Sequence, residues 1–98
     1  MAYRIDYQPE AVRDAAFYGV VSRLRKTCEV QLRHEPTRKT RNRFRAQPNP
    51  YGEYELRDQP YRIYFDVDEE GRRVVVMAVL YKPRETPYRR GEKVSTHE

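Results

Sequence analysis

Cationic side chains in the second half of the chain are the residues best suited to chemistry, because they can bind phosphate. Arg62 lies in an alternating run whose apolar residues point to the opposite face, and Arg57 precedes a short turn, which places the two side by side across a hairpin. A guanidinium is planar and can bind two phosphate oxygens at once. The structural alternative is cross-strand ion pairing with Glu55 or Asp66.

Acid–base chemistry at a bound phosphate also needs a base and an acid close to it. Glu55 is a candidate base, although an ion pair with a neighbouring arginine would compete for it. The two histidines, His34 at a predicted helix end and His97 in the tail, are poorly placed and are expected to be surface residues.

Three tyrosines could stack on nucleic-acid bases, namely Tyr64, Tyr81 and Tyr88, and Tyr88 is also a candidate catalytic residue. The chain has nine tyrosines, so most of them must be packing residues. Cys28 lies on an apolar helical seam and is expected to fill space in the core. We find no catalytic triad, glycine-rich phosphate loop or metal-ligand spacing, so neither a cofactor nor a metal is expected.

The positive charge of the chain is concentrated in one segment. The net charge is +5, and residues 37–51 hold five bases and no acid, while the other 15 bases balance 15 acids. Such a segment suits a polyanionic partner, because each neutralised phosphate releases counterions. The alternative is a solvated loop that aids solubility. The candidate RNA-binding residues of this segment are Arg38, Lys39, Arg41, Arg43 and Arg45.

The elements that must position these residues form an α+β domain. Residues 3–7 alternate as a short strand, and Pro9 opens a helix to about Gly19. A second helical segment follows from about residue 20 to 34, with either a break or a kink at Gly19. Residues 54–57, 61–66 and 73–81 are three strands joined by short turns, and must therefore form an antiparallel meander. The order β-α-α-β-β-β predicts a mostly antiparallel sheet with two helices packed on one face. The first strand is expected beside the second or third strand of the meander.

Length and composition limit the remaining possibilities. The 98 residues suffice for one small domain, predicted over residues 1–88, with a flexible C-terminal tail over residues 89–98. A single cysteine excludes an internal disulfide and favours a reducing, cytoplasmic setting. The sequence shows neither an apolar run of membrane-spanning length nor a signal-peptide pattern, so no membrane partner is expected.

Several short blocks, arriving in a fixed order, resemble the RelE/ParE toxins of bacterial toxin–antitoxin systems. The order of predicted elements is similar to theirs, and the likeness extends over about residues 3–88. The blocks are residues 31–36 (QLRHEP), 40–43 (TRNR), 48–50 (PNP), 55–57 (ELR) and 61–68 (YRIYFDVD).

The resemblance implies a small toxin neutralised by a cognate antitoxin protein. RelE-type members cut mRNA on the ribosome, and their phosphate-contacting arginine corresponds to Arg62. Lys82 and Arg84 are similar to the family's basic pair after the last strand, and Tyr88 to its downstream tyrosine. The resemblance therefore implies that the catalytic residues are Arg62, Lys82, Arg84 and Tyr88. Glu53 and Glu55 stand where RelE itself has two lysines. A ParE-like toxin that poisons DNA gyrase without nuclease activity, or a degenerate member that only binds its antitoxin, are therefore the alternatives.

Overall fold

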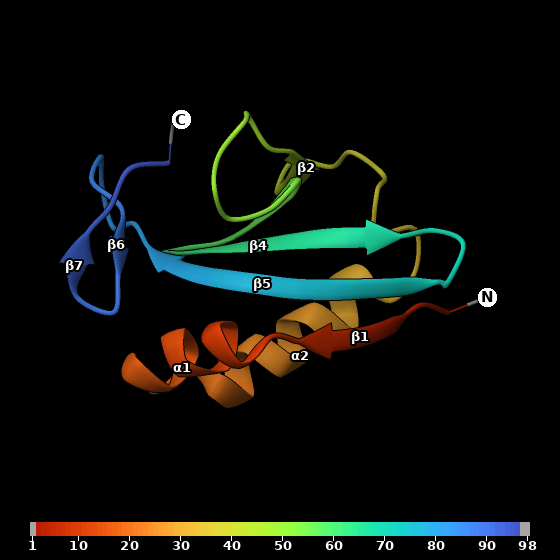
Figure 1. Cartoon of the computed structure of the whole chain (residues 1–98), viewed down its shortest axis with the longest axis horizontal. Helices are drawn as coiled ribbons and strands as arrows, with labels where there is room; N and C mark the ends of the chain where they lie inside the picture. The colour runs from red at the N-terminus through yellow and green to blue at the C-terminus, as the bar shows by residue number, and fades with distance from the viewer. Residues whose placement is uncertain (1, 97–98) are drawn as a thin grey trace.

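The computed structural model describes residues 2–96, which form two helices and a seven-stranded sheet (Figure 1). The first half of the chain holds one strand and both helices, and the sheet is built mainly from the second half. The elements are β1 (Arg4–Tyr7), α1 (Pro9–Phe17), α2 (Val21–Leu32), β2 (Arg43–Arg45), β3 (Tyr54–Asp58), β4 (Tyr61–Asp68), β5 (Arg73–Tyr81), β6 (Tyr88–Arg89) and β7 (Glu92–Lys93).

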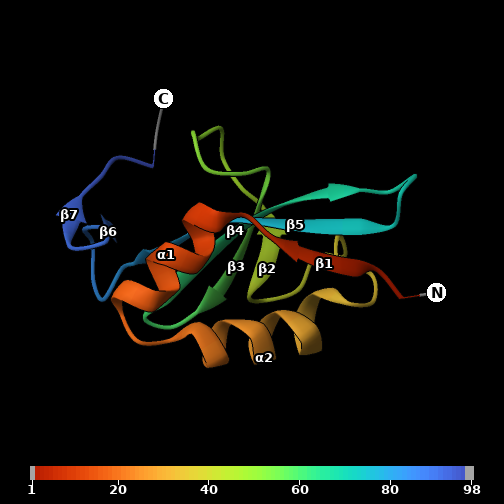
Figure 2. The same ribbon diagram turned by 60° about the horizontal axis from the view of Figure 1, so that its bottom comes forward.

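The two helices are separate and cover one face of the sheet, as Figure 2 shows. Helix α1 begins at Pro9, whose missing N–H costs nothing at a first helical position. Gly19 has a φ of +70°, a conformation that ends the first helix before the second begins and that suits glycine. The helices bury small and aliphatic side chains against the sheet, namely Ala11, Ala15, Leu24, Cys28 and Leu32. Neither helix is long and apolar enough to cross a membrane.

The predicted meander is confirmed, because β3, β4 and β5 pair antiparallel in order. The first strand, β1, pairs with β5 in parallel, so it lies beside the last of the two strands proposed for it. Residues 43–45, where no strand is predicted from the sequence, form strand β2, which pairs with the edge of β3. The sheet order is therefore β2-β3-β4-β5-β6-β7, and β1 pairs with the first half of β5 on the edge that β6 joins at Tyr81.

A bulge in β5 gives this strand two buried faces. Phe65 pairs with Val76 while Tyr64 pairs with Ala78, which leaves Met77 as an extra residue. Phe65 and Val76 pack under the helices in the main core. On the opposite face a second, smaller core joins Tyr64, Ala78 and Leu80, covered in part by Ala46, Tyr51 and Val94. The apolar character of β5 on both faces is explained by these two cores.

The C-terminal segment folds back as a hairpin over the part that the structure describes, which differs from the expected flexible tail from residue 89. Strands β6 and β7 pair across a turn at Arg90 and Gly91, whose φ values of 46° and 81° fit a tight hairpin. Arg89 and Arg90 both bond to Asp14 of helix α1, which holds the hairpin against the body. Residues 97 and 98 lie outside the described residues.

Candidate nucleic-acid interface

A groove of about 310 Å³ opens on the face of the sheet that carries the smaller core, opposite the helices. It lies over β3 and β4, and the segment that follows β2 forms one of its walls. Five predicted site residues line it together with one carboxylate. They are Arg45, Arg57, Arg62, Tyr64 and Lys82, with Glu55 between them.

The centre of the groove is a carboxylate held by two arginines. Arg57 and Arg62 are direct partners across the β3–β4 hairpin, as their positions around the turn predict. Oε2 of Glu55 accepts a hydrogen bond from Nη1 of Arg62 at 3.0 Å and from Nε of Arg57 at 3.3 Å. The side chains of Arg62 and Glu55 are 9% and 11% exposed, against 44% for Arg57. The ion pair between Arg62 and Glu55 is therefore the contact that a structural role predicts. It also engages the guanidinium that would bind phosphate.

The guanidinium of Arg62 is incompletely paired. Its Nε is buried and has no hydrogen-bond partner among residues 2–96. A buried polar group without a partner costs about 1–3 kcal/mol, and more when the group is charged. Arg62 is thus a desolvated cation with an unused donor beside an open groove, which is an arrangement that favours binding of a further anion.

Tyr64 lies on the floor of the groove and is only 4% exposed. Its ring packs against Tyr51, with centroids 5.7 Å apart. Burial, with a smaller effect of the neighbouring Glu55 carboxylate, raises the pKa of Tyr64 to about 12, so the phenol is neutral at physiological pH. Tyr64 therefore supports the groove from below and offers little ring surface to a stacked base.

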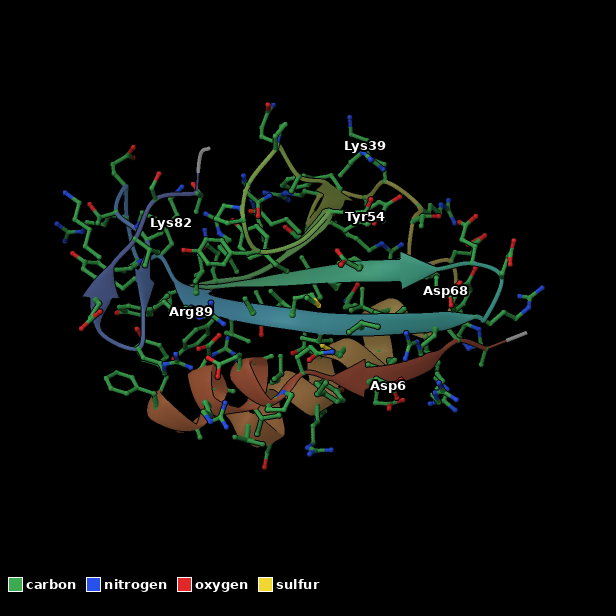
Figure 3. All side chains as sticks on the ribbon, in the orientation of Figure 1. Asp6, Lys39, Tyr54, Asp68, Lys82 and Arg89 are labelled. Carbon is green, nitrogen blue, oxygen red and sulfur yellow. The ribbon has the colours of Figure 1, made fainter. Side chains whose placement is uncertain are left out.

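The three candidate site residues that follow β5, namely Lys82, Arg84 and Tyr88, do not all line the groove. Lys82 follows β5, where its backbone N–H donates to the carbonyl of Pro60 at 2.8 Å, and it lines the groove (Figure 3). Arg84 is exposed beyond it and does not line the groove. Tyr88 lies in β6 against Tyr81, with ring centroids 6.5 Å apart, and likewise does not line the groove.

The basic segment is divided by strand β2. Arg43 is buried, and its guanidinium donates to the carbonyls of Arg38 (2.8 Å) and Gln31, so it holds the loop against helix α2. Burial lowers the pKa of Arg43. Arg45 belongs to the groove lining, but its guanidinium lies 5.6 Å from the ring centroid of Tyr54, which packs against the main core. Arg38 is exposed and pairs with Glu35 at 3.3 Å.

Two further residues of this segment, Lys39 and Arg41, are exposed outside the groove, and Figure 3 shows Lys39 well away from Lys82. The five bases therefore do not act as one patch. They divide into a groove residue, a structural residue and a set of solvated residues.

Sequence reasoning missed two residues that shape the groove. Asn49 fixes the wall, because its Oδ1 accepts from the backbone N–H groups of Tyr51 (2.7 Å) and Gly52 (3.1 Å). The Pro-Asn-Pro run is a turn signal that could have indicated this role. Thr96 reaches the groove from the C-terminal segment, and no local pattern indicates that. In residues 2–96, no histidine lines the groove and no three metal-ligating side chains gather.

Comparison with known proteins bears on the fold. No protein-family model matches the sequence, and no curated protein matches it significantly. Among solved structures, a chain of the RelBE2 toxin–antitoxin complex from Mycobacterium tuberculosis is similar, with a TM-score of 0.68 and 20% sequence identity. The match covers 84% of this chain and 100% of that one. The chain therefore has the RelE-like α+β fold that the sequence resemblance implied, and the predicted fold class is confirmed.

Proposed function

We propose that this protein is the toxin of a bacterial type II toxin–antitoxin system, and that it inhibits translation in the cytoplasm by cutting mRNA on the ribosome. The observation that carries the proposal is the groove that Arg57, Arg62 and Lys82 line beside Glu55. The fold shared with a chain of a toxin–antitoxin complex supports it independently. A groove with three basic residues and one carboxylate in its lining suits a phosphodiester backbone.

The groove supplies groups for each part of metal-free RNA cleavage. Glu55 would take the proton of the 2′-hydroxyl, whose oxygen attacks phosphorus and forms a cyclic phosphate as the bond to the 5′-oxygen breaks. Arg57 and Arg62 would bind the crowded phosphate in the transition state. Lys82 would donate a proton to the leaving 5′-oxygen. Arg84 and Tyr88, which lie outside the groove, would contact mRNA or ribosomal RNA beside it.

The decisive experiment adds purified protein to a cell-free translation extract and maps breaks in the translated mRNA. The expected result is arrest with cuts inside the translated region. Arg62→Ala should reduce cleavage by about 100-fold, because it removes a preorganised cation from the developing charge. Arg41→Ala removes the same charge from an exposed position and serves as the matched control. Arrest that is equally strong in both variants would contradict the role of Arg62.

A second candidate function is a non-nuclease toxin that acts on DNA gyrase, as ParE-type toxins do. The observation that favours it is the ion pair between Arg62 and Glu55, which engages both the phosphate-binding cation and the candidate base. Inhibition of gyrase supercoiling without mRNA cleavage would support this candidate. A degenerate member that only binds an antitoxin would cause no growth arrest when its expression is induced.

The proposed protein partner is a cognate antitoxin, since the structural neighbour was solved as a toxin–antitoxin complex. Strand β5, the most apolar strand, is not available to it, because two cores cover both faces of this strand. The antitoxin must therefore bind another surface. Co-expression with the neighbouring small reading frame should raise the yield and give a complex on size-exclusion chromatography. Elution of the two proteins separately would contradict the pairing.

A further inference from the structure

Glu55 places a negative charge inside a groove whose proposed ligand is itself an anion. A single carboxylate oxygen, Oε2, accepts from Arg62 at 3.0 Å and from Arg57 at 3.3 Å. An oxygen that receives donors from two arginines is also what a non-bridging phosphate oxygen would be at this site. The carboxylate therefore stands where the proposed ligand would bind.

The ion pair with Glu55 also leaves part of the Arg62 guanidinium without a hydrogen-bond partner among the described residues. Glu55 pairs with Nη1 alone, while the buried Nε has no partner among the described residues. A phosphodiester carries two free oxygens, and a guanidinium can bind both side-on through Nε and a terminal nitrogen. A phosphate could thus satisfy the donor that Glu55 leaves unpaired, if the arginine turns to meet it. The displaced carboxylate would remain in the groove, which Lys82 also lines.

We propose that Glu55 is an internal competitor for the phosphate-binding position of Arg57 and Arg62, and that an RNA phosphate displaces it when the chain binds its ligand. This inference rests on the proposed function, because it takes the ligand of the groove to be RNA. In the free protein the carboxylate neutralises a cation that would otherwise be buried and unpaired. The same carboxylate lowers the affinity of the groove for any other anion.

As a competitor, Glu55 would set the affinity of the groove for RNA. This role differs from that of a base in cleavage. A base that only removes a proton should leave RNA binding nearly unchanged when it is replaced. If Glu55 competes with phosphate, removing its charge should make the protein bind RNA more tightly. Binding of RNA that cannot be cleaved therefore separates the two roles, since a 2′-O-methyl group takes away the proton that a base would remove.

The test compares Glu55→Gln with Glu53→Gln, which removes the same charge one residue before strand β3 begins. Glu53 is half-exposed, at 54%, pairs with Arg45 at 3.8 Å and does not line the groove. Affinity for a short 2′-O-methyl oligoribonucleotide would be measured by fluorescence anisotropy. Inorganic phosphate would be titrated against thermal unfolding as a second probe. Circular dichroism would confirm that both variants fold. If Glu55→Gln is unfolded, Glu55→Met would be used in its place.

We expect Glu55→Gln to bind the oligonucleotide about tenfold more tightly than the parent chain, which corresponds to one added charge-assisted contact. Phosphate should raise its unfolding temperature more than that of the parent. Glu53→Gln should change affinity by no more than about twofold, as exposed charges do. Equal gains in both variants, or weaker binding by Glu55→Gln, would overturn the inference.

The outcomes also separate this inference from the proposed function. If the parent chain binds the oligonucleotide and arrests translation while Glu55→Gln binds no more tightly, the competitor role fails and the function stands. If neither the parent chain nor Glu55→Gln binds RNA, and translation continues, the proposed function fails and the competitor role fails with it.

Discussion

Two buried carboxylates, Asp14 and Glu55, lie on opposite sides of the sheet and are paired in different ways. Asp14 is fully buried and accepts from the backbone N–H of Val79 at 3.0 Å, from Arg89 at 3.0 Å and from Arg90 at 2.9 Å. Glu55 accepts from two arginines through one oxygen, and one of them, Arg62, keeps an unpaired buried Nε.

The difference shows how the same kind of ion pair can serve the fold in one place and a ligand in another. At Asp14 both carboxylate oxygens are used, and the partners come from β5 and the C-terminal hairpin, so the cluster closes the structure. At Glu55 the pairing is partial and borders an open groove. A fully satisfied polar network stabilises a unique fold, whereas a partly satisfied one leaves donors for another molecule.

The comparison predicts that the largest loss of stability comes from Asp14. Asp14→Ala should lower the free energy of unfolding by about 3 kcal/mol or more, because it leaves two arginines and a backbone N–H without their acceptor. Urea denaturation followed by circular dichroism would measure the change. Asp6→Ala is the control, since Asp6 is 39% exposed and pairs with Arg4 and Arg73 at the surface. A loss at Asp14 no larger than at Asp6 would remove the distinction between the two clusters.

A double-mutant cycle at the groove should give a smaller energy. Glu55→Gln and Arg62→Met, separately and together, should show a coupling of about 1–2 kcal/mol in the free energy of unfolding. The coupling is smaller than the loss at Asp14 because a single hydrogen bond joins the pair and Nε is already unpaired. Urea midpoints of the three variants and the parent would provide the cycle. A coupling as large as the Asp14 effect would mean that the pair is built for stability.

The smallest expected effect is an alkaline titration that reports on the charge of Glu55. The pKa of Tyr64 is raised to about 12, first by burial and then by the Glu55 carboxylate. A tyrosine in an unfolded chain titrates near pH 10. The neutral phenol therefore contributes stability that is complete below about pH 10 and is lost as the pH rises towards about 12.

Tyrosinate absorbance of the parent chain, minus that of Tyr64→Phe, would isolate this group among the nine tyrosines. Glu55→Gln should shift the pKa of Tyr64 downwards, because it removes a neighbouring negative charge. Glu53→Gln should leave it unchanged. An unchanged pKa in Glu55→Gln would indicate that the carboxylate does not carry its charge beside Tyr64.

Local patterns were enough to predict the main elements and the partners across the β3–β4 hairpin. Alternation along residues 61–68 placed Arg62 opposite the apolar face, and the short turn placed Arg57 beside it, as the structure confirms. The same local patterns gave the order β-α-α-β-β-β, which resembles that of a toxin family, and the shared fold bears the fold class out.

Features that depend on contacts between distant residues could not be predicted. Arg43 had the same basic character as Arg45 in the sequence, yet tertiary packing buries one of them under helix α2. The C-terminal hairpin looked like a polar tail because its anchor, Asp14, lies 75 residues away from Arg89. The burial of Tyr64 depends on Tyr51 and Val94, which come from segments that show no periodicity.

The pairing of the first strand with the last long one has a consequence for how the protein is made. Strand β1 pairs with β5, which comes about 70 residues later in the sequence. Asp14 likewise pairs with the distant Arg89 and Arg90. Forming a long-range pairing costs loop entropy before the pairing stabilises the fold, and this cost slows folding. A nascent chain cannot complete its sheet until β5 has been synthesised. The groove over β3 and β4 is therefore assembled only after Lys82, which follows β5, has been made.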